Sequence, residues 1–280
     1  GLSRRRRLVS QEASVKYFLL GALSSAIFLY GIALVYGAAG SFQLGIIAQA
    51  RMTQISGSKI FAAGMILLAV GLLFKVGAVP FHNWTPDVYT GAPSPVTAFM
   101  SIATKMVAVL GLMRVMYVAL GAMRWDWQLL LAVVAVASMA VGAIVGLSQT
   151  DMKRMLAYSS IAHAGFIMVG VVGAYTLQTG QRPDQTGSVS SVLIYLAGYG
   201  LATIGFFMVI LMVRKAGGES TEIDSWAGLG RRHPMLGALI VLFMLSFAGI
   251  PATAGFTGKL FVFLAGWRGG YAWLVLLGVI

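Results

Sequence analysis

Four ionisable residues lie inside long apolar runs of the sequence, where a charged group is costly. Lys75 and Lys105 are flanked on both sides by Leu, Phe, Val, Ala and Met, and each lies near the middle of its run. His163 lies near the middle of a third run, and Lys259 lies past the middle of a fourth. Uncompensated charge at such positions is strongly unfavourable, so we interpret these residues as functional.

The chemistry that these side chains offer is proton transfer. Desolvation favours the neutral amine of a buried lysine, whereas a nearby carboxylate or a chain of waters favours the ammonium. Such a group takes up a proton when a counter-charge approaches and releases the proton when the counter-charge leaves. We therefore predict a proton relay that runs in the membrane plane through Lys75, Lys105, His163 and Lys259.

A structural interpretation stays open for two of these residues. The stem of a membrane lysine can carry its ammonium to the lipid–water interface, which fits Lys16 and Lys59 and is compatible with Lys259. His163 is compatible with a neutral imidazole bonded to a backbone carbonyl. From half-depth the stem of a lysine is too short to reach either surface, which favours the functional interpretation of Lys75 and Lys105.

His82 and Asp87 lie in the stretch PFHNWTPDVYTGAP, which is rich in Pro, Gly and aromatic residues. Irregular backbone at membrane depth is tolerated only where protein or a water-filled cavity surrounds it. The functional interpretation is a proton entrance or a gate. The alternative is a tight interfacial turn that Trp84 and Tyr89 anchor.

A counter-charge for Lys75 is missing from the apolar runs. The eight acidic residues all lie in loops or near predicted helix ends: Glu12, Asp87, Asp126, Asp151, Asp184, Glu219, Glu222 and Asp224. We therefore expect no buried carboxylate within the chain to pair with Lys75. The acid is expected on a segment outside these residues or on a neighbouring subunit.

The composition is that of an integral membrane protein. Hydrophobic residues make up 59% of the 280 and charged residues 10%, with a mean hydropathy of +0.86. Soluble domains are typically about one-quarter charged. Long apolar runs indicate helices, whereas a barrel would show short segments of alternating polarity. The net charge of +12 comes from basic residues between the apolar runs, which is typical of topology signals and argues against nucleic-acid binding.

The chain contains no cysteine, so it offers no thiolate metal site, iron–sulfur cluster or disulfide. We also find no nucleotide-binding loop or redox motif. We therefore expect no metal or cofactor in this chain, and any redox centre in a partner.

We predict helices over 13–38, 59–90, 93–119, 127–148, 153–176, 188–213 and 235–266, with a last one that begins near 271. The helices 59–90 and 235–266 each have about 32 residues. That length spans about 48 Å, against a hydrocarbon core of about 30 Å, so both are expected to tilt or break. The predicted breaks fall at Gly77, Pro80, Gly249 and Pro251.

Two interrupted helices in corresponding positions indicate an inverted repeat with ion sites at the breaks. We therefore expect one all-α, polytopic membrane domain over 1–280 with two discontinuous transmembrane helices. Residues 1–124 would form most of the first repeat, and residues 125–280 most of the second.

The basic loops predict the topology. Assigning successive loops to alternate sides collects ten residues on one side: Arg4, Arg5, Arg6, Arg7, Lys153, Arg154, Arg214, Lys215, Arg231 and Arg232. The other side collects five: Arg51, Lys59, Arg124, Arg182 and Arg268. We therefore expect the N-terminal end in the cytoplasm. Because the chain opens on Gly1 and closes ten residues into an apolar run, we expect an interior fragment of a longer subunit.

Five stretches carry a resemblance to a known family: EASVKYFLLGALSSAIFLYGIALVYG, LLFKVGAVPFHNWTPDVYTGAPSPVTAFMSIATK, QTDMKRMLAYSSIAHAGFIMVG, WAGLGRRHPMLG and LSFAGIPATAGFTGKL. In these stretches the chain resembles the antiporter-like membrane subunits of respiratory complex I, the proton-pumping NADH:quinone oxidoreductase. The lysine within SIATK favours one of the three sister subunits, because the other two typically have histidine in that region.

The resemblance implies an antiporter-like fold, in a subunit of fourteen helices with two inverted five-helix repeats. Lys75 matches the family's central protonatable lysine, Lys105 its connecting lysine, and Lys259 a lysine towards the exit. His82 and His163 occupy positions where members often have histidine. The family's functional glutamate lies on the helix before Gly1, while Glu12 and Lys16 match another family pair.

The favoured function is proton translocation as a membrane subunit of an enzyme, a redox-driven NADH:quinone oxidoreductase of the bacterial plasma membrane. Flavin, iron–sulfur clusters and quinone are expected in partner subunits, and neighbouring antiporter-like subunits and the lipid bilayer as contacts. The alternative is a subunit of a multisubunit Na+/H+ antiporter or a related membrane-bound hydrogenase. A third possibility is a haem or quinone scaffold in which the lysines are structural.

Overall fold

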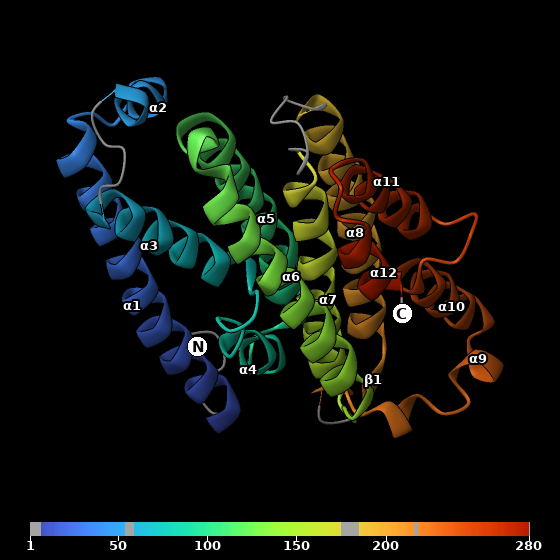
Figure 1. Ribbon diagram of the computed structural model, residues 1–280. Coiled ribbons are helices and arrows are strands. Elements are labelled where there is room, and N and C mark those ends of the chain that lie inside the picture. Colours follow the sequence, from blue (N-terminus) through green and yellow to red (C-terminus); the bar gives the residue numbers. More distant parts are fainter. Residues whose placement is uncertain (1–6, 54–58, 175–184, 216–217, 280) are drawn as a thin grey trace.

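The computed structural model describes residues 7–53, 59–174, 185–215 and 218–279 (Figure 1). Within these ranges six helices are long and apolar enough to cross a membrane, and a shorter apolar helix covers Pro234–Ala248. Large apolar side chains stay exposed along several of them, including Phe18, Leu147 and Leu201. An apolar exterior on long helices is what a lipid environment requires, so the chain is a multi-pass membrane protein.

The helices follow one another as α1 Leu8–Ala39, α2 Leu44–Thr53, α3 Lys59–Val76, α4 Trp84–Gly91, α5 Ser94–Arg114, α6 Arg124–Leu147, α7 Met152–Val172, α8 Gln185–Met212, α9 Leu229–Arg232, α10 Pro234–Ala248, α11 Ala254–Arg268 and α12 Ala272–Val279. A π-helical turn, Val115–Ala119, follows α5. Two-residue strands β1 Arg214–Lys215 and β2 Gly218–Glu219 pair antiparallel after α8.

Both predicted interruptions are present among these elements. Residues 59–90 form α3 and α4 with non-helical residues 77–83 between them, and residues 235–266 form parts of α10 and α11, separated at 249–253. The predicted glycines end the first member of each pair, because Gly77 and Gly249 have φ of 77° and 80°. Left-handed φ is accessible to glycine without a steric penalty.

The structure corrects the prediction in other places. The first helix begins at Leu8, five residues before its predicted start, and α2 and the β1–β2 hairpin have no counterpart in the predicted set. The seventh helix ends at Val172, while the predicted residues 175 and 176 lie outside the described ranges. Helix α2 and the β1–β2 hairpin were missed because neither contains a long apolar run.

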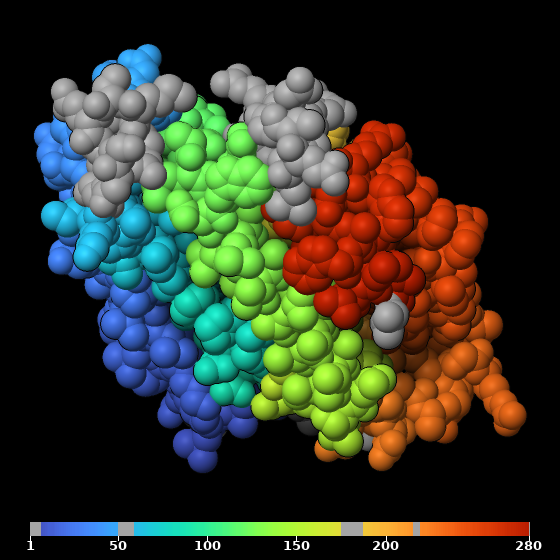
Figure 2. Space-filling view, in the orientation of Figure 1, coloured from blue at the N-terminus to red at the C-terminus, as the bar shows by residue number. Residues whose placement is uncertain are grey.

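Helix α7 lies at the centre of the bundle and α1 at its edge. In the most apolar window, 72% of the residues of α7 are buried, against 17% of those of α1. Helix α7 contacts α4, α6, α8 and α11. Figure 2 shows α1, in blue, at one edge and the orange residues around α9 and α10 at the opposite edge. A side chain on α7 is therefore far better shielded than one on α1.

Glycine allows α6 and α7 to approach closely. A Cβ at Gly142 would lie 2.4 Å from the backbone nitrogen of Ala162, and one at Gly165 would lie 2.7 Å from the carbonyl oxygen of Ala135. Neither position can hold a larger residue without backbone movement. This packing fixes α7, which carries His163.

Candidate functional site

Lys105 lies in the protein interior where α5 meets α7. The residue is 3% exposed, and its Nζ donates to both the carbonyl oxygen and the Oγ of Ser160, each at 2.6 Å. The hydroxyl of Tyr89 on α4 lies 3.3 Å from the same Oγ. Ser160 thus joins α4, α5 and α7 at one point. The prediction that Lys105 lies away from water is confirmed by its burial.

An aromatic cluster extends from Lys105 toward His163. Nζ of Lys105 lies 5.4 Å from the ring centroid of Tyr199 on α8, within the range of a cation–π contact. The Tyr199 ring stacks on His163 with centroids 4.4 Å apart and planes at 29°. Nδ1 of His163 is hydrogen-bonded to the hydroxyl of Tyr195. The imidazole is therefore bonded to a side chain, not to the backbone carbonyl of the structural alternative.

Lys259 lies at the other end of this cluster. Its Nζ lies 4.7 Å from the ring centroid of Phe166, and Phe166 meets His163 edge-on with centroids 5.7 Å apart. The same Nζ donates to the carbonyl oxygen of Ala248, 3.0 Å away, across the break between α10 and α11. Phe166 can stabilise a cation, but it has no exchangeable hydrogen. A proton that moves between His163 and Lys259 therefore needs another carrier, such as water.

Lys75 does not join this cluster. It lies in the last turn of α3 and is exposed on the described chain. No described residue is hydrogen-bonded or ion-paired to it. Its side chain lines a groove of about 530 Å³ between α1, α3 and α5, together with residues that include Ser24, Ser25 and Thr104. The structure thus brings three of the four predicted relay residues into one cluster and leaves the fourth at a groove.

His82 and Asp87 are not in contact with each other or with the lysine cluster. His82 lies in the break after α3, and its buried Nδ1 has no hydrogen-bond partner among the described residues. Asp87 on α4 accepts from Nζ of Lys16 at 2.7 Å and from Nη1 of Arg154 at 3.1 Å. Lys16 also pairs with Glu12 at 2.5 Å. Asp87 is therefore the centre of an ion-pair network that joins α1, α4 and α7.

The interfacial-turn alternative for this stretch is wrong in one respect. Trp84 is 4% exposed and Tyr89 2%, so neither can anchor the chain at a lipid–water interface. The indole Nε1 of Trp84 donates to the carbonyl oxygen of Phe74 at 2.9 Å, at the end of α3. Tyr89 points toward Ser160 and the ammonium of Lys105.

Sequence reasoning missed a buried ion pair. Lys153 is 1% exposed, and its Nζ lies 2.8 Å from Oε2 of Glu219, whose side chain is 7% exposed. Lys153 was predicted only as the first residue of a helix and as a topology signal, and Glu219 only as an acid in a loop or near a helix end. The side chain of Glu219 is buried but pairs with Lys153 and not with Lys75. One feature of the sequence could have indicated the burial of Lys153. It precedes Ser160 by seven residues, which places both on one face of the helix.

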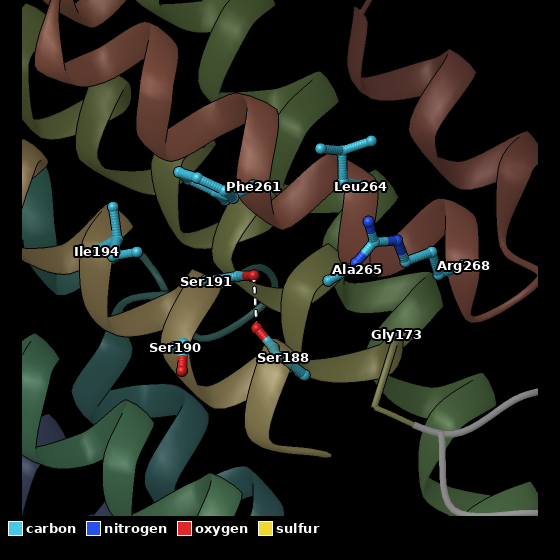
Figure 3. A pocket seen from close by; sticks show the side chains of 10 residues that line it. Gly173, Ser188, Ser190, Ser191, Ile194, Phe261, Leu264, Ala265 and Arg268 are labelled. Carbon is cyan, nitrogen blue, oxygen red and sulfur yellow. Dashed lines mark hydrogen bonds between the residues drawn. The ribbon is translucent and has the colours of Figure 1, made fainter. Parts of the chain in front are cut away.

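A separate cleft of about 220 Å³ lies between the start of α8 and the end of α11 (Figure 3). Its polar lining includes Ser188, Ser191 and Arg268, and none of the predicted site residues contributes. Ser188 and Ser191 donate to the carbonyl oxygens of Gly170 and Gly187. These two hydroxyl hydrogens are thus engaged within the protein, and the cleft is not part of the lysine cluster. Within the described ranges no three His, Asp or Glu residues gather as a metal site would require.

The long apolar helices, the two interruptions and the buried cations define a polytopic membrane protein. Residues 2–280 match the family described as the NADH:quinone oxidoreductase/Mrp antiporter, TM, and the chain belongs to that family.

Its relatives carry a consistent name. The chain is 75% identical to NADH-quinone oxidoreductase subunit N of Cutibacterium acnes over all of its residues and 52% of that protein. It is 52% identical to the protein of the same name from Rhodococcus opacus, again over its full length and 50% of that protein. The chain thus spans about half the length of the curated relatives it matches.

Solved structures agree on the fold. A chain of respiratory complex I from Thermus thermophilus with bound aureothin matches with a TM-score of 0.79 and 37% identity, over 98% of this chain and 57% of that one. A chain of the Mrp complex from Dietzia sp. matches with a TM-score of 0.84 and 23% identity, over 97% and 48%. At that identity the second match shows the fold alone.

Proposed function

We propose that this chain is part of a proton-translocating membrane subunit of a redox-driven NADH-quinone oxidoreductase. The identity of 75% with a subunit N supports the assignment to that complex. The observation that carries the proposed mechanism is the ammonium of Lys105, buried against Ser160 and beneath a ring that stacks on His163. A charged amine buried in this way is unfavourable unless polar groups compensate for its lost hydration, and Ser160 and Tyr199 provide that compensation.

In this proposal Lys105 and Lys259 hold protons alternately, and His163 lies between them. Lys105 has Ser160 and the face of Tyr199 to stabilise its charged form, while Lys259 has the carbonyl of Ala248 and the face of Phe166. Each lysine is thus stabilised without contact to a carboxylate of the described residues. Either one can lose its proton without leaving an unpaired buried anion behind.

Lys75 acts at the start of the relay in this scheme. Its ammonium faces a groove, so we propose that a carboxylate from a segment outside these 280 residues, or from a neighbouring subunit, occupies that groove. Approach and withdrawal of that charge would raise and lower the proton affinity of Lys75. His82, whose buried Nδ1 has no hydrogen-bond partner among the described residues, would exchange protons with water at the break.

The energy comes from outside this chain. Moving one charge across a membrane is worth about 2.3 kcal/mol per 100 mV. We propose that flavin, iron–sulfur clusters and quinone in partner subunits supply that energy, and that neighbouring antiporter-like subunits flank the chain. We also propose that the complex lies in the bacterial plasma membrane. The N-terminal end would be cytoplasmic, as the excess of basic residues on that side favours.

The test is Lys105→Met in the full-length subunit within the assembled complex. We expect loss of proton pumping, measured with a pH-sensitive dye in inverted membrane vesicles supplied with NADH, together with slower coupled NADH oxidation. Lys59→Met, at an exposed position, is the control and should pump normally. Wild-type protons per NADH in the Lys105→Met complex would refute the relay.

Co-purification separates the proposal from the exchanger alternative. We expect flavin and iron–sulfur polypeptides to co-purify with the full-length subunit. A complex that lacks them and acidifies vesicles only in response to a sodium gradient would favour the antiporter.

A further inference from the structure

The buried pair of Lys153 and Glu219 is tied to the joint between α4 and α5. Nζ of Lys153 donates to the carbonyl oxygen of Ala92 at 3.1 Å, and Oγ of Ser94 donates to Oε2 of Glu219 at 2.9 Å. Ala92 follows the last residue of α4, and Ser94 is the first residue of α5. One ion pair therefore binds both sides of a joint only two residues long.

Glu219 reaches this joint because the segment after β2 is bonded to the start of α7. The amide of Met152 donates to the carbonyl of Thr221 at 2.7 Å, and the amide of Ile223 donates to that of Thr150 at 2.9 Å. The hydroxyl of Thr221 also donates to the carboxylate of Asp151. The carboxylate of Glu219 is thus presented by backbone that is fixed to α7, the same helix that carries Lys153.

The joint connects the two helices that meet Ser160. Tyr89 lies three residues before Ala92 on α4, and Lys105 lies eleven residues after Ser94 on α5. Their side chains converge on Ser160, two turns along α7 from Lys153. The pair and Ser160 are therefore two points on one face of α7, about 10 Å apart along its axis. Between them Leu156 and Ala157 are buried and apolar.

The two points together set the register of α5 against α7. From Ser94 to Lys105 the rise along α5 is about 16 Å, which exceeds the spacing on α7. Long side chains on a helix lean toward its N-terminus. Lys105 therefore reaches back from its own turn to Ser160, and a shift of α5 by one turn would carry its ammonium out of reach.

On these grounds we propose that Lys153 and Glu219 are positioning residues for the Lys105 site. Their ion pair fixes the joint between α4 and α5 against α7, so that the ammonium of Lys105 and the hydroxyl of Tyr89 meet at Ser160. This inference rests on the proposed relay function of Lys105. Neither residue of the pair needs to carry a translocated proton.

The test compares single and double variants of the full-length subunit in the assembled complex. Removing one partner of a buried ion pair leaves an uncompensated charge, whereas replacing both with apolar residues of similar size is often neutral for stability. We expect Lys153→Met and Glu219→Gln each to lower the amount of assembled complex several-fold. The double variant Lys153→Met with Glu219→Met should restore assembly. Glu222→Gln, an exposed acid on the same loop, is the matched control.

Protons pumped per NADH oxidised is the readout that a merely structural pair would not move. We expect the assembled double variant to have a ratio between those of the wild type and the Lys105→Met complex. A wild-type ratio in the double variant would overturn the inference. Failure of the double variant to assemble, with Glu222→Gln assembling normally, would also overturn it, because the pair would then be required for the fold itself.

Lys105→Met, measured in parallel, separates this inference from the proposed function. A wild-type ratio in Lys105→Met refutes the relay and removes the basis of the inference. A low ratio in Lys105→Met with a wild-type ratio in the double variant refutes the inference alone.

Discussion

The two interrupted elements of this chain end their first helices in the same way. At the ends of α3 and α10, Gly77 and Gly249 take up left-handed backbone angles. In both, the amides of the glycine and of the residue after it turn back to carbonyls of the last helical turn. This is the Schellman arrangement, which pairs the carbonyls that a helix end leaves free. The relation of the two elements as inverted repeats over 1–124 and 125–280 stays a prediction.

The two elements differ in what binds a last-turn carbonyl. At the first break the neutral indole of Trp84 donates to Phe74, whereas at the second the ammonium of Lys259 donates to Ala248. The carbonyl end of a helix carries partial negative charge and so favours a cation. Lys259 is thus held by its own element. Lys75 is not, and its ammonium is free to respond to a charge that arrives from elsewhere.

Replacing Lys75 should have the largest effect in this comparison. We expect Lys75→Met to abolish proton pumping and to slow coupled NADH oxidation strongly. Assembly should stay near the wild-type level, because the side chain of Lys75 is exposed and no described residue is hydrogen-bonded or ion-paired to its ammonium. Pumping in inverted vesicles and the amount of complex on native gels measure the two effects.

Lys59→Met is the matched control for this variant, since Lys59 is an exposed lysine at the other end of α3. Equal pumping by the Lys75 and Lys59 variants would contradict a special role for the lysine at the groove.

Substituting Lys259 tests the other half of the comparison. Arginine keeps the positive charge beside the carbonyl of Ala248 but does not readily release a proton. We therefore expect Lys259→Arg to assemble normally and to pump several-fold more slowly than Lys59→Arg. Lys259→Met should in addition destabilise the complex by about 1 kcal/mol, because the hydrogen bond to an exposed helix-end carbonyl is lost. Normal pumping by Lys259→Arg would make this lysine a structural cap.

The breaks and the ionisable members of the central cluster, Lys105, His163 and Lys259, were accessible from the sequence, whereas their partners Ser160, Tyr195, Tyr199 and Phe166 were not. Gly77 and Gly249 interrupt runs too long for one crossing, and glycine near proline marks the place where a helix can end. Lys105 and His163 stand in long, predominantly apolar runs, so whichever way they point they meet protein or lipid. The residue types alone then predict that polar partners must offset the cost of burying these ionisable groups.

The orientation of Lys75 and the pair of Lys153 with Glu219 were not accessible. Helix α3 is apolar all round, so its sequence defines no face on which Lys75 must lie. Lys153 and Glu219 are 66 residues apart, and each is adjacent to polar residues typical of a solvated loop. Only the folding of the β1–β2 hairpin onto the start of α7 buries them. Burial of that kind depends on tertiary contact, which local patterns do not encode.

Adding a methyl group at each break should have an intermediate effect. A left-handed residue other than glycine costs about 1–2 kcal/mol, so Gly77→Ala and Gly249→Ala should lower the stability of the purified complex similarly. A Cβ at Gly249 would lie 2.8 Å from Cδ of Lys259, whereas one at Gly77 would lie 2.8 Å from Oγ1 of Thr85. We therefore expect Gly249→Ala to lower pumping more than Gly77→Ala. Equal pumping by the two variants would contradict the link between Gly249 and Lys259.

The smallest effect is expected at Trp84, where a neutral donor does what Lys259 does at the other break. Trp84→Phe keeps an aromatic ring against Phe74 and Tyr17 but removes the indole N–H. Loss of that hydrogen bond should lower the free energy of unfolding by about 1 kcal/mol. Pumping should be unchanged, because no proton leaves an indole in the relay. Trp125→Phe, at a half-exposed site on α6, controls for loss of a tryptophan as such. Trp84→Phe could instead reduce pumping as much as Lys259→Arg does. That result would mean that pumping depends on the hydrogen bond to the helix-end carbonyl, and not on the charge of Lys259.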